Sequence, residues 1–130
     1  MLLGVAVAAC SGADQVPSQS QVGLAVQGAI GAIKEYDNFH VNVLTAECEK
    51  AGKDAAWCPV CFVASPAIAD GGDDFIIATF RAEKFTRRGS VWGYENVHHG
   101  EQKERLPDTS ESSKTAAREF CEVRFGALKQ

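Results

Sequence analysis

Two cysteines that are three residues apart are the clearest candidates for chemistry in the sequence. Cys58 and Cys61 lie in the segment Trp57-Cys58-Pro59-Val60-Cys61. A Cys-x-x-Cys pair can lower the pKa of one thiol, and the thiolate that results is a nucleophile able to exchange disulfide bonds. The pair therefore indicates redox chemistry, unless both sulfurs serve a structural role.

Residues 57–61 resemble the Trp-Cys-x-x-Cys site of thioredoxin-like oxidoreductases. This resemblance implies a thiol–disulfide enzyme that uses Cys58 and Cys61. The family requires a strand directly before the motif and a helix directly after it. Here residues 46–56 are typical of a helix, and Pro66 would break a helix that began after Cys61. We therefore keep the enzyme as an alternative and favour structural disulfides.

A small structural zinc module is the second alternative. Cys58 and Cys61 have the spacing of a zinc knuckle, and His98 with His99 could complete the ligand set. Adjacent residues of a strand point to opposite faces of a sheet, so both histidines could reach one ion only if the chain bends. A second Cys-x-x-Cys is absent from the sequence. We assign no metal-binding residues and expect no cofactor.

Carboxylates gather at two places, residues 70–74 and the pair Glu47 and Glu49. The segment Asp70-Gly71-Gly72-Asp73-Asp74 lacks the spaced ligands and the late bidentate glutamate of a high-affinity calcium loop. It is typical of a solvated turn. We find no phosphate-binding loop after a strand and no serine in a nucleophile elbow. The sequence therefore nominates no catalytic residue, and we expect a protein that is not an enzyme.

The N-terminal residues have the composition of an export signal. Residues 2–9 are apolar but too few to span a bilayer, and small residues precede Cys10. Residues 7–10, Val-Ala-Ala-Cys, resemble the lipobox of bacterial lipoproteins, although Val7 replaces the usual leucine and no basic residue precedes Cys10. The resemblance implies lipidation of Cys10. In that family Ser11 would favour the outer membrane, so we expect a lipid-anchored protein on its periplasmic side.

The remaining four cysteines predict two disulfide bonds, because an even number in a small exported chain is typical of a covalent framework. They are Cys48, Cys58, Cys61 and Cys121. A bridge between Cys58 and Cys61 would close a very small loop and stabilise little. We therefore favour pairing of Cys48 and of Cys121 with one each of these two cysteines, although the sequence leaves open which pairs with which.

The chain of 130 residues has room for one domain, which we place at residues 20–130 after a signal-like segment (1–10) and a polar tether (11–19). Hydrophobic periodicity predicts a helix at 20–36, a strand at 39–43, a short helix at 45–56, an apolar loop at 57–69, a hairpin at 75–86 and 91–98, a polar loop at 99–111 and a helix at 110–128. These elements indicate an α+β fold, in which a small antiparallel sheet of about three strands packs against N- and C-terminal helices. We expect both helices on one face of the sheet.

The hairpin offers the remaining candidate surface, because Trp92 and Tyr94 share one face of a strand and both residue types are favoured binding anchors. The net charge of −4 and the lack of a basic cluster indicate that nucleic acid is not the partner. We therefore predict a non-enzymatic envelope lipoprotein-like domain that acts through contact with another envelope protein, with Trp92 and Tyr94 at the interface.

Overall fold

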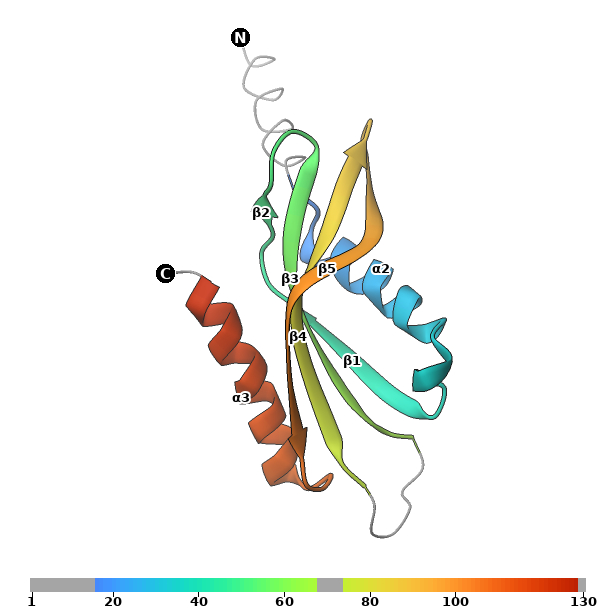
Figure 1. Cartoon of the computed structure of the whole chain (residues 1–130), viewed down its shortest axis with the longest axis vertical. Helices are drawn as coiled ribbons and strands as arrows, with labels where there is room; N and C mark the ends of the chain where they lie inside the picture. Colours follow the sequence, from blue (N-terminus) through green and yellow to red (C-terminus); the bar gives the residue numbers. More distant parts are fainter. Residues whose placement is uncertain (1–15, 68–73, 129–130) are drawn as a thin grey trace, which may run out of the picture.

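The computed structural model describes residues 16–67 and 74–128, which form an α+β domain with an antiparallel five-stranded sheet and two α-helices (Figure 1). The elements, in chain order, are α2 (Gln19–Gly31), the 3-10 turn η1 (Lys34–Tyr36), β1 (Phe39–Thr45), β2 (Glu49–Lys50), β3 (Ala55–Pro66), β4 (Ile76–Arg88), β5 (Val91–Leu106) and α3 (Glu111–Leu128).

The sheet has the strand order β1-β3-β4-β5, and β2 pairs with β3 beside β1. The pairing of β4 with β5 forms a long hairpin whose register shifts twice. Asn96 and Gly100 lie at these shifts with φ of 57° and 69°. Bulges of this kind bend a strand and increase its twist, and β5 curves strongly along its length (Figure 1).

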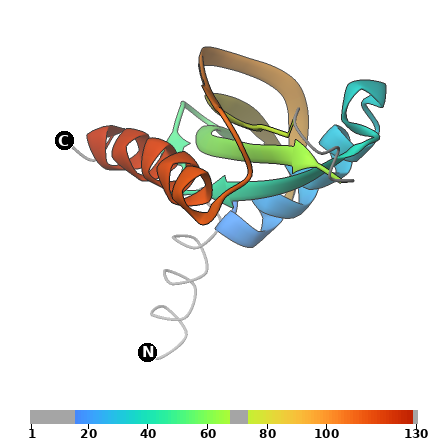
Figure 2. The same cartoon turned by 90° about the horizontal axis from the view of Figure 1, so that it is seen from below.

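The two helices pack on opposite faces of the sheet, so the expectation of both on one face was wrong. Along β3, Cys58, Val60 and Phe62 belong to the cluster that packs with α2, whereas Cys61 belongs to the cluster that packs with α3. Side chains of a strand alternate between faces, so these residues cover both sides of the sheet. In Figure 1 α3 and α2 lie on opposite sides of the strands, and Figure 2 shows the same two helices from below.

Three segments differ from their sequence predictions. Residues 45–56 contain the end of β1, the short strand β2 and a turn, with Asp54 at a φ of 58°, and no helix. The segment at 57–69, predicted as an apolar loop, contributes most of the central strand β3, which is buried on both faces. The predicted polar loop at 99–111 is largely the second half of β5. The sheet therefore has five strands, where about three were predicted.

Both terminal helices and the hairpin confirm their predictions. Ser18 is the N-cap of α2 and forms a capping box with Gln21. The Ser18 hydroxyl accepts a hydrogen bond from the Gln21 backbone N–H, and the Gln21 side-chain oxygen accepts one from the Ser18 backbone N–H. The β4–β5 turn lies at Gly89 and Ser90, where Gly89 has a φ of 65°. At the start of α3, the Asp108 carboxylate accepts hydrogen bonds from the Ser110 backbone and from the Ser110 and Ser113 hydroxyls.

Candidate functional site: a groove at the end of helix α3

The four cysteines of the domain form two disulfide bonds, Cys48–Cys58 and Cys61–Cys121. Cys58 and Cys61 therefore belong to different bridges. They lie on an extended strand and face opposite sides of the sheet, with about 10 Å of strand between them. This arrangement is not the helix-supported thiol pair that the resemblance to thioredoxin-like oxidoreductases implies.

Metal ligands are not assembled around the histidines either. Across residues 16–67 and 74–128, no three His, Cys, Asp or Glu side chains are grouped so that they could hold a metal ion. His98 pairs with Glu83 and His99 with Ala82 along β5, and both histidines are exposed. Asp70 and Asp73, of the acidic turn, lie outside the described residues.

The predicted contact residues Trp92 and Tyr94 lie on the face of the sheet that α2 covers. Both side chains are half-buried and pack against the cluster that contains Val22, Val26 and Phe85. The Trp92 ring lies 5.7 Å from the Arg87 guanidinium, and the Tyr94 ring lies 5.3 Å from that of Phe85. Part of each aromatic side chain therefore stabilises the fold.

The opposite face carries a groove of about 540 Å³, where the sheet extends beyond the end of α3. Trp57 and a row of paired residues, Pro59, Ala82 and His99, form its floor, and the exposed Glu49, which pairs with Trp57, stands at its edge. The Trp57 and His99 rings meet edge to face with centroids 4.3 Å apart. Phe125 and Leu128 of α3 close one side, so the floor is predominantly apolar.

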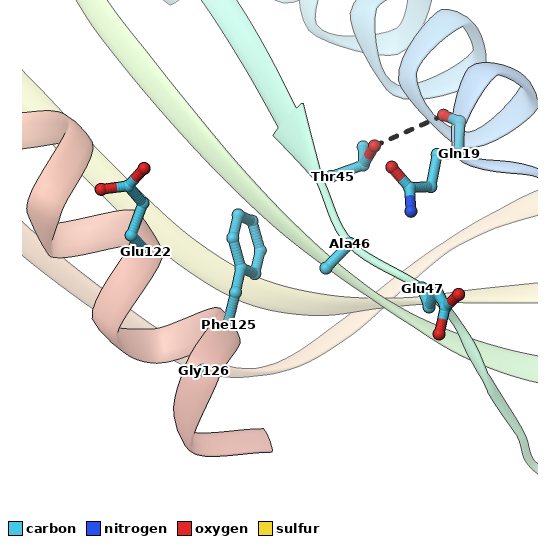
Figure 3. Close-up of a pocket in the computed structure, with 7 residues that line it drawn as sticks. All are labelled: Gln19, Thr45, Ala46, Glu47, Glu122, Phe125 and Gly126. Carbon is cyan, nitrogen blue, oxygen red and sulfur yellow. Dashed lines mark hydrogen bonds between the residues drawn. The ribbon is translucent and has the colours of Figure 1, made fainter. Parts of the chain in front are cut away.

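A second hollow of about 410 Å³ adjoins the groove, and the two share Ala46, Glu47 and Phe125 in their linings (Figure 3). Figure 3 shows the Phe125 ring between the Glu122 carboxylate on α3 and Ala46 of the β1–β2 connection. Glu47 and Gln19 lie on the far side from α3. We call the two hollows together the α3 groove.

Both disulfides position the walls of the α3 groove. Cys48–Cys58 fastens the β1–β2 connection to β3, which places Glu47 and Glu49 at the rim. Cys61–Cys121 fastens α3 to the centre of the sheet. One helical turn after Cys121, the Phe125 ring packs against that of Phe80, with the ring centroids 5.7 Å apart. Covalent links on both sides of the α3 groove restrict how far its walls can separate.

The rim of the α3 groove is acidic. Glu47, Glu49 and Glu122 are exposed, and within the described residues none of the three makes a hydrogen bond or an ion pair. The Lys84 ammonium lies 5.9 Å from the centroid of the Trp57 ring, but Lys84 is not among the residues that line the α3 groove. The α3 groove therefore combines an apolar floor with unpaired negative charge.

A buried charged network occupies the other face, and our sequence analysis missed it. The Glu83 carboxylate is fully buried and accepts from Arg81 Nε at 2.5 Å and from the Tyr94 hydroxyl at 2.8 Å. Burial opposes the charge of Arg81, but the hydrogen bond and charge of Glu83 outweigh it and raise the pKa of Arg81. Burial and the hydrogen bond to Glu83 raise the pKa of Tyr94 to about 12. The polar residues Arg81 and Glu83 within an apolar, alternating strand were the available signal.

The α3 groove was also not predicted as one site, although its parts were visible. Trp57 was noted for its cysteine neighbours, and Glu47 with Glu49 as paired carboxylates. Their meeting depends on the position of α3 across the sheet, which residue spacing does not reveal. The predicted lipidation site, Cys10, lies outside the described residues. Among the helices that the structure describes, none is long and apolar enough to cross a membrane.

Known proteins give no further guide to the role of this site. The chain was compared with models of protein families, with curated proteins and with solved structures, and none of the three comparisons found a match.

Proposed function

We propose that this protein is a non-enzymatic binding domain that acts through contact with another protein, and that the α3 groove is its contact surface. One observation carries this proposal: Trp57 on the floor and Phe125 on the wall are only half-buried, and Leu128 beside them is half exposed, so the α3 groove presents apolar surface to solvent. Aromatic side chains in a pocket are the usual anchors of protein interfaces, and exposed apolar grooves on small domains commonly mark binding sites.

The chemistry of the α3 groove supports binding more than catalysis. Its sulfur, on Cys48, is closed in a disulfide bond. Its imidazole, on His99, packs against Trp57 and has no hydrogen bond to a carboxylate within the described residues. A general base needs such an orienting partner and a nucleophile within hydrogen-bond reach. Rigid walls and an apolar floor are instead what recognition requires.

The setting of this function is also part of the proposal. Two disulfides are typical of proteins that fold in an oxidising compartment. Together with the lipobox-like residues that end at Cys10, they support an exported protein with a lipid anchor on the periplasmic side of the outer membrane. Incorporation of labelled palmitate into the wild type, and none into a Cys10→Ser variant, would test the anchor.

Site-specific photocrosslinking in the native envelope tests the contact surface. Leu128 is half exposed in the α3 groove, whereas Leu24 is 76% exposed on α2, on the other side of the sheet. We expect a photoreactive residue at position 128, and not one at position 24, to capture one defined protein. Phe125→Glu should abolish that capture without unfolding the domain, as circular dichroism would check. Equal capture from both positions would contradict the proposal.

The hairpin residues Trp92 and Tyr94 remain a second candidate contact surface. Both are half-buried, so part of each ring is open to a partner. They lie on the opposite face from the α3 groove, and one small partner segment would not reach both places. A photoreactive residue at Val91, which is 67% exposed beside Trp92, would report this alternative in the same experiment.

A further inference from the structure

We infer that the α3 groove takes a basic peptide segment with an apolar side chain at its centre, contributed by the partner protein. This inference rests on the proposed function and names the chemistry of the partner. The half-buried rings of Trp57 on the floor and Phe125 on the wall suit one apolar side chain between them. Because the floor is only partly covered, a side chain seated there would remove further apolar surface from water.

The charge of the segment follows from the rim. Glu47 and Glu49 stand on one side of the α3 groove and Glu122 on the other, all exposed and without a charged partner among the described residues. Glu47 and Glu122 line one hollow, and Glu47 and Glu49 line the other, so uncompensated carboxylates at the rim attract cations along the whole α3 groove. A partner with lysine or arginine on both sides of its apolar residue would neutralise these carboxylates.

No cation among residues 16–67 and 74–128 forms an ion pair with Glu47, Glu49 or Glu122. Lys84 lies against the Trp57 ring, and no carboxylate pairs with it within the described residues. Arg124 turns away from the rim, because its guanidinium donates to the Gln102 side chain at 3.1 Å and to the Phe120 carbonyl at 3.0 Å. The acidic rim is therefore available for charges brought by a partner.

The shape favours a chain segment over a compact ligand. The two hollows adjoin through Ala46, Glu47 and Phe125, so the α3 groove runs from the sheet surface at Leu128 back along the last two turns of α3 toward Gln19. A peptide can place successive side chains along such a path. The combined hollow is within the size range of ligand-binding sites, and its open sides leave room for the chain to enter and leave.

Short synthetic peptides test the inference by nuclear magnetic resonance. One probe carries a central phenylalanine flanked by lysines, and a second carries the same phenylalanine flanked by glutamates. The protein has two tryptophans, and these lie on opposite faces of the sheet. We expect the lysine probe to shift the indole N–H resonance of Trp57 and leave that of Trp92 in place. The affinity should fall as salt is added, because the rim is exposed.

Matched neutralisations locate the charge effect. Glu47→Gln and Glu122→Gln should each lower the affinity for the lysine probe by about threefold, and the double variant should lower it by about tenfold. Glu35→Gln removes the same charge from η1, outside the α3 groove, and should leave the affinity unchanged. Equal or tighter binding of the glutamate probe at Trp57 would overturn the inference while leaving the α3 groove as a contact surface. If neither probe shifts the indole N–H resonance of Trp57, the inference is also overturned. The crosslinking at Leu128 would then test the proposed function independently.

Discussion

The Tyr94 hydroxyl donates a hydrogen bond of 2.8 Å to the fully buried carboxylate of Glu83, across the β4–β5 hairpin. The other oxygen of that carboxylate accepts from Arg81, whose guanidinium lies 4.7 Å from the centroid of the Phe62 ring. A buried charge is tolerated only when it is paired and hydrogen-bonded. Tyr94 and Arg81 together therefore allow a charged side chain to occupy the apolar layer beneath α2.

Tyr94→Phe should lower the free energy of unfolding by about 2 kcal/mol, because one oxygen of the buried Glu83 carboxylate would lose its donor. Urea denaturation measures the difference. Tyr36→Phe is the matched control, since the Tyr36 hydroxyl has no hydrogen bond within the described residues, and it should change stability by less than about 0.5 kcal/mol. Equal effects of the two variants would show that the hydrogen bond to Glu83 contributes nothing.

The titration of Tyr94 should follow its raised pKa. Burial and the hydrogen bond to Glu83 favour the neutral phenol in the folded state, with a pKa of about 12 against an ordinary value of 10.0. The stabilisation is therefore complete below pH 10 and is lost as the pH rises toward 12. Ultraviolet difference spectra of a Tyr36→Phe protein would isolate the Tyr94 tyrosinate. A midpoint near 10 in the folded protein would contradict the expected shift.

The sequence predicted the terminal elements of the fold better than its centre. Val22, Val26 and Ile30 recur at helical spacing, and Ser18 supplies the capping residue, so α2 was predictable from local signals. The strand β3 was not, because it is buried on both faces and therefore lacks the alternation that marks a half-buried strand. Pro59 and Pro66 within it also suggested a loop.

The polar half of β5 was missed for the opposite reason. Residues 95–105 are all exposed, so this part of the edge strand carries no apolar pattern, and its polar residues from 99 onward suggested a loop. Its pairing with β4, from Phe80–Gln102 to Ile76–Leu106, is a long-range property of the hairpin. For the same reason the α3 groove was not foreseen, since it needs both the extended sheet and the position of α3.

The disulfide that closes the longer loop should contribute more to stability. Cys61–Cys121 spans 60 residues and Cys48–Cys58 spans 10, for which loop entropy predicts about 4 and about 3 kcal/mol. Replacing each pair with two alanines makes matched variants, and urea denaturation without reductant compares them. A larger loss for the Cys48 and Cys58 pair would show that chain entropy does not govern the difference.

Asp108 should make the start of α3 sensitive to acid. Hydrogen bonds from the Ser110 and Ser113 hydroxyls and from the Ser110 backbone lower the pKa of Asp108. The stabilisation is therefore present above the ordinary value of 3.8 and is lost as the pH falls through the lower folded value. Asp108→Asn should lower the thermal midpoint at neutral pH. In strong acid the thermal midpoints of the variant and the wild type should become equal. Asp37→Asn, an exposed change in the turn after η1, should follow the wild type throughout.

The two tryptophans should separate stability from binding. Trp92 is half-buried against the α2 cluster and beside Arg87, so Trp92→Ala should cost about 2 kcal/mol of unfolding free energy, less than a fully buried tryptophan would. Trp57 lies on the floor of the α3 groove, so Trp57→Ala should cost less stability and abolish partner capture from position 128. Melting curves and crosslinking of both variants measure the two properties. If the Trp92→Ala protein melts normally but no longer captures the partner, the contact surface lies on the hairpin and not in the α3 groove.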